Sequence, residues 1–130
     1  LAIMNRHYVR EHQLPQAAPK NYYAFQFVEL METHIHKLQR VQDYASLLKI
    51  SRITLNHSVM AQYGVSATYL LKQRLLAEIK NELLFTGKSI SEIAYAFNFS
   101  EPPHLMRFFK QQTGKTCREF QEDYKNGVYE

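Results

Sequence analysis

Three small groups of residues could support catalysis or metal binding, and none has a complete set of partners. His34 and His36 are separated by one residue, so on a helix they lie on different sides, and no third ligand has suitable spacing. Cys117 begins an expected helix, where a thiol pKa can be lowered, but no His or Asp is spaced to activate it. Arg74 and Glu78 have the spacing of a solvated helical ion pair. We therefore expect no enzyme, no metal and no cofactor.

Two other stretches carry side chains suited to the edges of nucleic-acid bases. Arginine pairs with guanine, asparagine with adenine, and Ile or Met contacts the thymine methyl group. The first set is Arg52, Ile53, Asn56 and His57, and the second is Pro102, Pro103, His104, Met106 and Arg107. Such residues can read DNA only if each set lies on the exposed face of a helix.

Apolar periodicity predicts an all-α chain of about seven helices. The expected helices cover about 22–39, 41–48, 52–63, 67–85, a short segment after Ser89, about 101–112 and about 117–125. The first contains the apolar residues Phe25, Val28, Leu30, Met31 and Ile35, and the longest contains Leu71, Leu75, Leu76, Ile79 and Leu83. The expected N-caps are Ser51, Ser66, Ser89, Ser100 and Thr116.

An internal repeat of about 50 residues is the most informative pattern. Segment 62–66 recurs as 112–116, and segment 43–51 parallels 92–100. Each copy predicts a short helix with a small residue, a turn with a buried apolar residue, and a second helix with two buried positions. These positions are Ala45, Ile50, Leu55 and Val59 in the first copy and Ala94, Phe99, Leu105 and Phe109 in the second. Two short helices joined in this way predict a helix-turn-helix. A duplicated helical hairpin that binds protein, without specific DNA readout, is the alternative.

The long helix over 67–85 sets the expected spacing of the two copies. Its length is about 28 Å at 1.5 Å per residue, near the ~34 Å repeat of B-DNA, so one chain could read two successive major grooves. Phosphate contacts are expected from helix N-termini and basic side chains: Ser51, Ser89, Thr116, Lys72, Arg74, Lys88, Lys110 and Lys115.

The overall charge is mildly basic, at +4 with a pI near 9.2, which fits a polyanionic partner. The 130 residues predict a linker or upstream fragment over 1–21, a first subdomain with the linking helix over 22–85, and a second over 86–130. The single cysteine excludes an internal disulfide and fits a reducing cytoplasm, and no apolar run reaches the length of a membrane span. Because the chain begins with Leu, we expect a fragment of a longer protein.

Three runs of the second copy resemble the DNA-binding domain of the AraC/XylS family of transcription regulators. They are LLFTGKSISEIAY (83–95), FNFSEP (97–102) and RFFKQQTGKT (107–116), and the resemblance extends from about Phe25 to about Tyr124. It implies seven helices, base-reading positions at Ile53, Asn56 and His57 and at the second set named above, and bacterial promoter control, often through RNA polymerase. It also implies an upstream effector-binding domain in the full-length chain. The usual glycine of the second turn is Asn98, and a usual polar position is Pro103.

Overall fold

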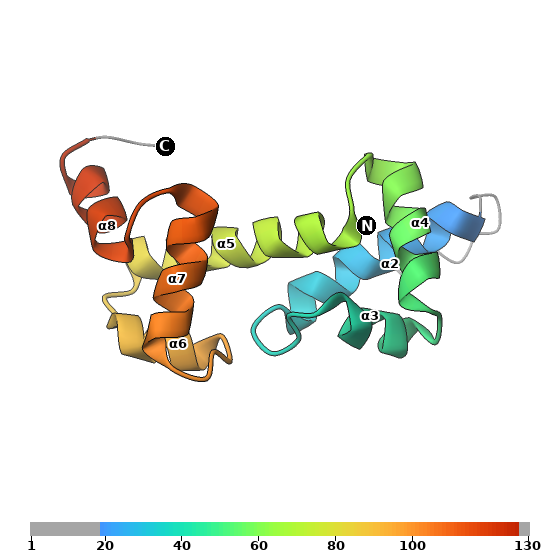
Figure 1. Ribbon diagram of the computed structural model, residues 1–130, viewed down its shortest axis with the longest axis horizontal. Helices are drawn as coiled ribbons and strands as arrows, with labels where there is room; N and C mark the ends of the chain where they lie inside the picture. The colour runs from blue at the N-terminus through green and yellow to red at the C-terminus, as the bar shows by residue number, and fades with distance from the viewer. Residues whose placement is uncertain (1–18, 128–130) are drawn as a thin grey trace, which may run out of the picture. The chain divides into compact units, whose positions relative to one another are not determined.

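The computed structural model describes residues 19–127, and within this range the chain forms seven helices and no strand (Figure 1). The helices are α2 (Pro19–His34), α3 (Val41–Leu48), α4 (Arg52–Tyr63), α5 (Ala67–Phe85), α6 (Ile90–Ala96), α7 (Pro102–Thr113) and α8 (Cys117–Lys125). The predicted all-α class is confirmed. Most of the linker expected over 1–21 lies outside the described residues.

The chain divides into two compact units. The first contains residues 19–33 and 40–71, and the second contains residues 34–39 and 72–127. The division falls within α5, at Leu71 and Lys72, whereas the sequence pattern placed the whole linking helix with the first subdomain. Within the first unit α4 packs against α3, and within the second α7 packs against α6 and α8 (Figure 1).

The core of the first unit is built from one face of α2 and the facing sides of α3 and α4. Ala24, Phe27 and Tyr44 are fully buried, and the Phe27 and Tyr44 rings meet edge to face with centroids 5.3 Å apart. Of the apolar residues whose spacing predicted this helix, Phe25, Val28 and Leu30 are only half-buried. The buried face of α2 instead follows Ala24, Phe27 and Met31 at three- and four-residue steps.

The core of the second unit repeats this arrangement. Its fully buried side chains include Ile79, Ile93, Ala94, Phe97, Leu105 and Phe109. The predicted apolar stripe of α5 is confirmed, because all five of its residues are at most 5% exposed. Ile50 and Phe99, which were expected to be buried in the two turns, are only half-buried.

Local hydrogen bonds define most helix ends. Ser51, Ser66, Ser89 and Thr116 each accept an amide of the first turn, and Ser89 and Thr116 form full capping boxes with Glu92 and Glu119. The first helix differs from the prediction: it begins at Pro19 and ends at His34, because the His34 carbonyl accepts the amides of Lys37 and Leu38 in a turn. Residues 19–21 are therefore helical instead of linker.

The prediction of Ser100 as an N-cap was wrong because the residues it would cap have no backbone N–H to donate. An N-cap oxygen accepts an amide two or three residues ahead. For Ser100 those residues are Pro102 and Pro103, which have no backbone N–H. The N-cap is Glu101, whose carbonyl accepts the His104 amide at 3.0 Å, and the two prolines occupy the first two helical positions.

Candidate nucleic-acid interface

The two interhelical turns have the same backbone conformation at aligned positions. Lys49 and Asn98 are the only non-glycine residues with positive φ between residues 19 and 127, at 60° and 68°. In each turn the next amide donates to the carbonyl of the alanine in the preceding helix: Ile50 N to Ala45 O at 3.1 Å, and Phe99 N to Ala94 O at 2.9 Å. A left-handed residue therefore redirects the chain at the aligned position before α4 and before α7.

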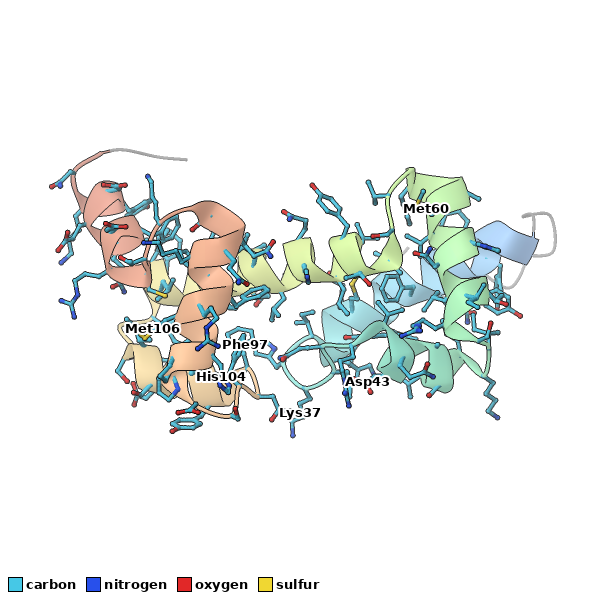
Figure 2. All side chains as sticks on the ribbon, viewed as in Figure 1. Lys37, Asp43, Met60, Phe97, His104 and Met106 are labelled. Atoms are coloured by element: carbon cyan, nitrogen blue, oxygen red, sulfur yellow. The ribbon has the colours of Figure 1, made fainter. Side chains whose placement is uncertain are left out.

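In the first unit, α4 is anchored along one face. Leu55 and Val59 are fully buried, and the buried Ser58 hydroxyl accepts the Ala24 amide of α2 at 2.9 Å. The opposite face carries Arg52, Ile53 and His57, all exposed, with Ile53 66% exposed; Met60 follows further along (Figure 2). Three of the four side chains predicted for this face thus point into solvent.

Asn56 has a structural contact that the sequence pattern did not predict. Its Oδ1 accepts the backbone N–H of Ala67 at 2.8 Å, which ties α4 to the first residue of α5. The side chain is half-buried, beside an open hollow of about 440 Å³ that Arg52, Ile53 and His57 also line. Its amide NH₂ makes no hydrogen bond to another described residue, so only half of the adenine-pairing group is free.

In the second unit, α7 is anchored by Leu105 and Phe109, both fully buried. Pro103, Met106 and Arg107 are exposed, and Met106 and His104 are seen on this helix in Figure 2. The side chain of Arg107 has no hydrogen bond or ion pair with any of residues 19–127. A salt bridge to Glu101 or Glu92, which would make Arg107 a structural charge, is not formed.

His104, in the first turn of α7, contacts residues at the start of that helix. Its Nδ1 lies 2.6 Å from the Ser100 hydroxyl oxygen, and its Nε2 lies 3.5 Å from a Glu101 carboxylate oxygen. The ring is half-buried, as is Pro102. His104 therefore sits among the second set of predicted readers, but with both ring nitrogens near protein partners.

The residues expected to contact phosphate fall into three groups. The hydroxyls of Ser51, Ser89 and Thr116 accept helix amides as caps. Three cations have carboxylate partners within the second unit: Arg74 with Glu78 at 2.7 Å, Lys88 with Glu82 at 2.9 Å, and Lys115 with Asp123. The remaining two, Lys72 and Lys110, are exposed and have no ion pair within the described range.

The other residues that were considered for catalysis or metal binding are packed within the helical cores or against them. Cys117 is 2% exposed, and desolvation raises the pKa of its thiol to about 11, which keeps it neutral near pH 7. His36 stacks on the buried Phe97 ring, with centroids 4.5 Å apart. From Pro19 to Gly127 no group of three His, Cys, Asp or Glu side chains is arranged to hold a metal ion, and no helix there is long and apolar enough to cross a membrane.

Three positioning or lining residues were missed by sequence reasoning. Lys49 takes the left-handed turn conformation, which its alignment with Asn98 in the repeat could have indicated. Ser58 is a buried cross-helix acceptor, and Arg118 lines a hollow next to α7. For Ser58 and Arg118 the sequence gives no local signal, because Ala24, which donates to Ser58, and the α6 and α7 residues that line the hollow with Arg118 belong to other helices.

Comparison with known proteins also identifies a helix-turn-helix domain. A family model described as a helix-turn-helix domain matches residues 44–123, more than half of the chain. A transcriptional regulator with an AraC-type DNA-binding domain from Chromobacterium violaceum is 28% identical, with a TM-score of 0.65 over 81% of this chain and 91% of that one. No curated protein shows a significant sequence match.

Two more distant structures share the fold. The C-terminal domain of AraT, a response regulator from Geobacillus stearothermophilus, is 19% identical with a TM-score of 0.71, over 81% of this chain and 88% of that one. The DNA-binding domain of AdpA, a global transcriptional factor solved in complex with a target DNA, is 20% identical with a TM-score of 0.69. That match covers 80% of this chain and 94% of the AdpA domain.

Proposed function

Because this chain belongs to the helix-turn-helix family as an AraC/XylS-type DNA-binding domain, we propose that it regulates transcription by reading specific duplex sequences with α4 and α7. The observation that carries the proposal is the matched pair of turns. Each turn uses a left-handed residue to present a helix with one fully buried face and one exposed face of base-compatible side chains.

The proposed binding mode uses two successive major grooves. In a helix-turn-helix the second helix enters the major groove, and its N-terminal residues face the bases. The 19-residue α5 is about 28 Å long at 1.5 Å per residue, which is close to one ~34 Å turn of B-DNA. One chain would then read an asymmetric site without a second copy.

The structure favours different roles within the predicted set of residues. Arg107 is the strongest candidate for base reading, because its guanidinium is exposed and uncommitted, and a bidentate Arg–guanine pair is the commonest specific contact. Arg52, Ile53 and His57 are the corresponding candidates on α4, and Met106 is suited to a thymine methyl group. Asn56 is better described as a positioning residue, since its oxygen is used by Ala67.

Phosphate contacts in this mode come first from the uncommitted cations. Lys72 and Lys110 need break no ion pair to reach a phosphate, whereas Arg74, Lys88 and Lys115 each exchange a carboxylate for it. The capped N-termini at Ser51, Ser89 and Thr116 add backbone partial charge of the right sign.

The proposal includes a regulatory context. AraT, which shares the fold, is described as a response regulator whose C-terminal domain has this architecture. By analogy we place this chain in an effector-responsive bacterial regulator that acts in the cytoplasm, where it meets promoter DNA and RNA polymerase. A helical module that binds only protein is the competing function.

The test begins with selection of bound duplexes from a random pool, followed by affinity measurements as a function of salt. Specific binding predicts a consensus sequence and a log-linear loss of affinity with salt concentration. Arg107→Ala should weaken binding to the selected duplex by about 10–100-fold and relax the preference at one base pair, as expected for loss of a bidentate contact.

Two matched variants separate readout from general charge. Arg107→Lys keeps the positive charge but loses the planar fork, so it should keep the salt dependence and still relax the base preference. Lys125→Ala removes an exposed charge from α8 and should leave the preference unchanged. A selection that returns no consensus, or an Arg107→Ala variant that keeps the wild-type ratio of affinities for selected and random duplexes, would reject specific readout by this residue.

A further inference from the structure

Glu101 places a carboxylate directly in front of the helix that is proposed to read bases in the second unit. It is the N-cap residue of α7, and its side chain is 58% exposed. The phosphates of DNA repel a carboxylate, so an acidic side chain in this place lowers affinity for most duplexes. It is favourable only where a base presents a hydrogen-bond donor to it.

The backbone at the start of α7 cannot use this carboxylate. Two other acids of the second unit, Glu92 and Glu119, each accept an N-cap amide at 2.8 Å in a capping box. Glu101 makes no such bond, and the two prolines that follow it have no N–H. The first amide beyond them, that of His104, donates to the Glu101 backbone carbonyl at 3.0 Å. The carboxylate is therefore not part of a cap.

Within residues 19–127 the Glu101 carboxylate has one ionic contact, with His104. The two groups are 3.5 Å apart, from Nε2 to Oε2, which is longer than an ordinary N–H···O hydrogen bond. On its other side the His104 ring is 2.6 Å from the Ser100 hydroxyl oxygen (Figure 2 labels His104). His104 thus lies beside the carboxylate, whose lone pairs stay available for a donor from outside the chain.

Glu101 also has the spacing of a base-reading residue. The rings of Pro102 and Pro103 carry no donor or acceptor, so the hydrogen-bonding side chains at this end of α7 are Glu101, His104 and Arg107. In zinc-finger helices, three successive bases are contacted by the residue before the helix and by its third and sixth residues. With Pro102 as the first residue of α7, Glu101, His104 and Arg107 occupy these three positions.

We infer that Glu101 reads a cytosine, accepting the N4 hydrogen that faces the major groove, in the half of the site that Arg107 contacts. This inference rests on the proposed function. An ionised carboxylate only accepts hydrogen bonds. Guanine and thymine present acceptors in the major groove, and adenine presents an acceptor beside its donor, whereas the polar group of cytosine is a donor alone. The carboxylate therefore favours cytosine over the other three bases.

Glu101→Gln separates base reading from a structural role, because it keeps the size of the side chain and disturbs no capping bond. Glutamine pairs in a bidentate manner with adenine, so the preference at one position should move from cytosine towards adenine. Affinity for random duplex should rise by about two- to fivefold, because a charge that the phosphates repel is removed. A residue that only supports the fold would cause neither change.

The test repeats the selection from a random duplex pool with the wild type, Glu101→Gln and a control, Glu122→Gln. Glu122 is an exposed acid on α8, so its replacement removes the same charge away from the reading helix. The wild type and Glu122→Gln should select the same sequence, with cytosine at the position that changes in Glu101→Gln. Circular dichroism of the three proteins checks that all are equally folded.

A modified duplex tests the contact itself. N4-methylcytosine at the selected position replaces the groove-facing hydrogen while the base pair is kept. It should weaken binding of the wild type at least about fivefold and leave binding of Glu101→Ala unchanged. A wild-type consensus without this cytosine, a cytosine preference that persists in Glu101→Gln, or no effect of N4-methylation on the wild type would overturn the role of Glu101 and leave the DNA-reading function intact. A selection without any consensus would reject both.

Discussion

At the scale of single residues, the left-handed residue in each turn has the most direct effect on how the exposed helices are presented. A left-handed conformation costs a residue with a Cβ about 1–2 kcal/mol, and asparagine tolerates it better than lysine. Asn98 offsets part of this cost through its Nδ2, which donates to the Lys37 carbonyl at 3.2 Å. Lys49 adopts the same conformation, with φ of 60°, and as a lysine it bears more of this cost.

Lys49→Gly should therefore stabilise the chain by about 0.5–1 kcal/mol, the relief of the left-handed strain less the added entropy of the unfolded glycine. The change is measured as the urea midpoint followed by circular dichroism. Lys49→Ala is the matched control, because it removes the same exposed side chain and keeps the strain. A gain that Lys49→Ala reproduces would trace the effect to the lysine charge instead of the backbone.

The positions proposed to read bases could be predicted from the sequence because helical periodicity determines which face of each helix is exposed. Once the repeat fixed Leu55 and Leu105 as buried, helical periodicity placed Ile53, His57 and Arg107 on the solvent side. The hydrogen-bond partners of individual polar atoms could not be predicted from the sequence. Whether Asn56 is free depends on where the chain returns after Gly64, which brings the amide of Ala67 to its oxygen.

At the scale of elements, helix ends were predictable where a cap marks them. The helices 41–48, 52–63, 67–85 and 117–125 match the structure, and three of them follow a Ser or Thr cap. The first helix was misplaced because no cap residue marks its start, and a turn in which the His34 carbonyl accepts the Lys37 and Leu38 amides ends it.

The junction of α4 and α5 supports a prediction that separates positioning from base reading. Asn56→Ala leaves the amide of the buried Ala67 without its acceptor and should destabilise the chain by about 1–2 kcal/mol. Asn56→Asp keeps an acceptor at the N-terminus of α5, where negative charge is favourable, so its stability should stay near that of the wild type. Thermal unfolding followed by circular dichroism measures both changes.

DNA affinity of the same two variants completes the comparison. Asn56→Asp adds a negative charge to the proposed reading face and should bind the selected duplex more weakly despite its stability. If Asn56→Asp is as unstable as Asn56→Ala, the contact with Ala67 is not what Asn56 contributes. A loss of preference at one adenine in a fully stable Asn56→Asp would restore it as a base reader.

At the scale of the whole molecule, the repeat predicts two cores, but not which segments belong to each. Residues 34–39 follow α2 in sequence, yet they group with the second unit. There His36 stacks on Phe97, and the Lys37 carbonyl accepts from Asn98. Contacts between residues 61 positions apart carry no local sequence signal, so the pattern could not assign this segment.

Two cores imply that each unit can open without the other, and Cys117 reports on the second. Its thiol is buried and its pKa is raised to about 11 by desolvation, so at pH 8 alkylation requires local opening of that unit. Leu55 and Leu105 are counterparts in the repeat, and both are fully buried. Each Leu→Ala change removes about 2–5 kcal/mol of stability.

Leu105→Ala should accelerate alkylation of Cys117 by iodoacetamide, because it lowers the cost of opening the unit that holds the thiol. Leu55→Ala should leave that rate near the wild-type value, since the lost packing lies in the other core. The Leu→Met pair, with a cost below about 1.5 kcal/mol, repeats the comparison where an Ala variant fails to fold. Equal acceleration by changes in both units would show that the two cores unfold as one cooperative body joined through α5.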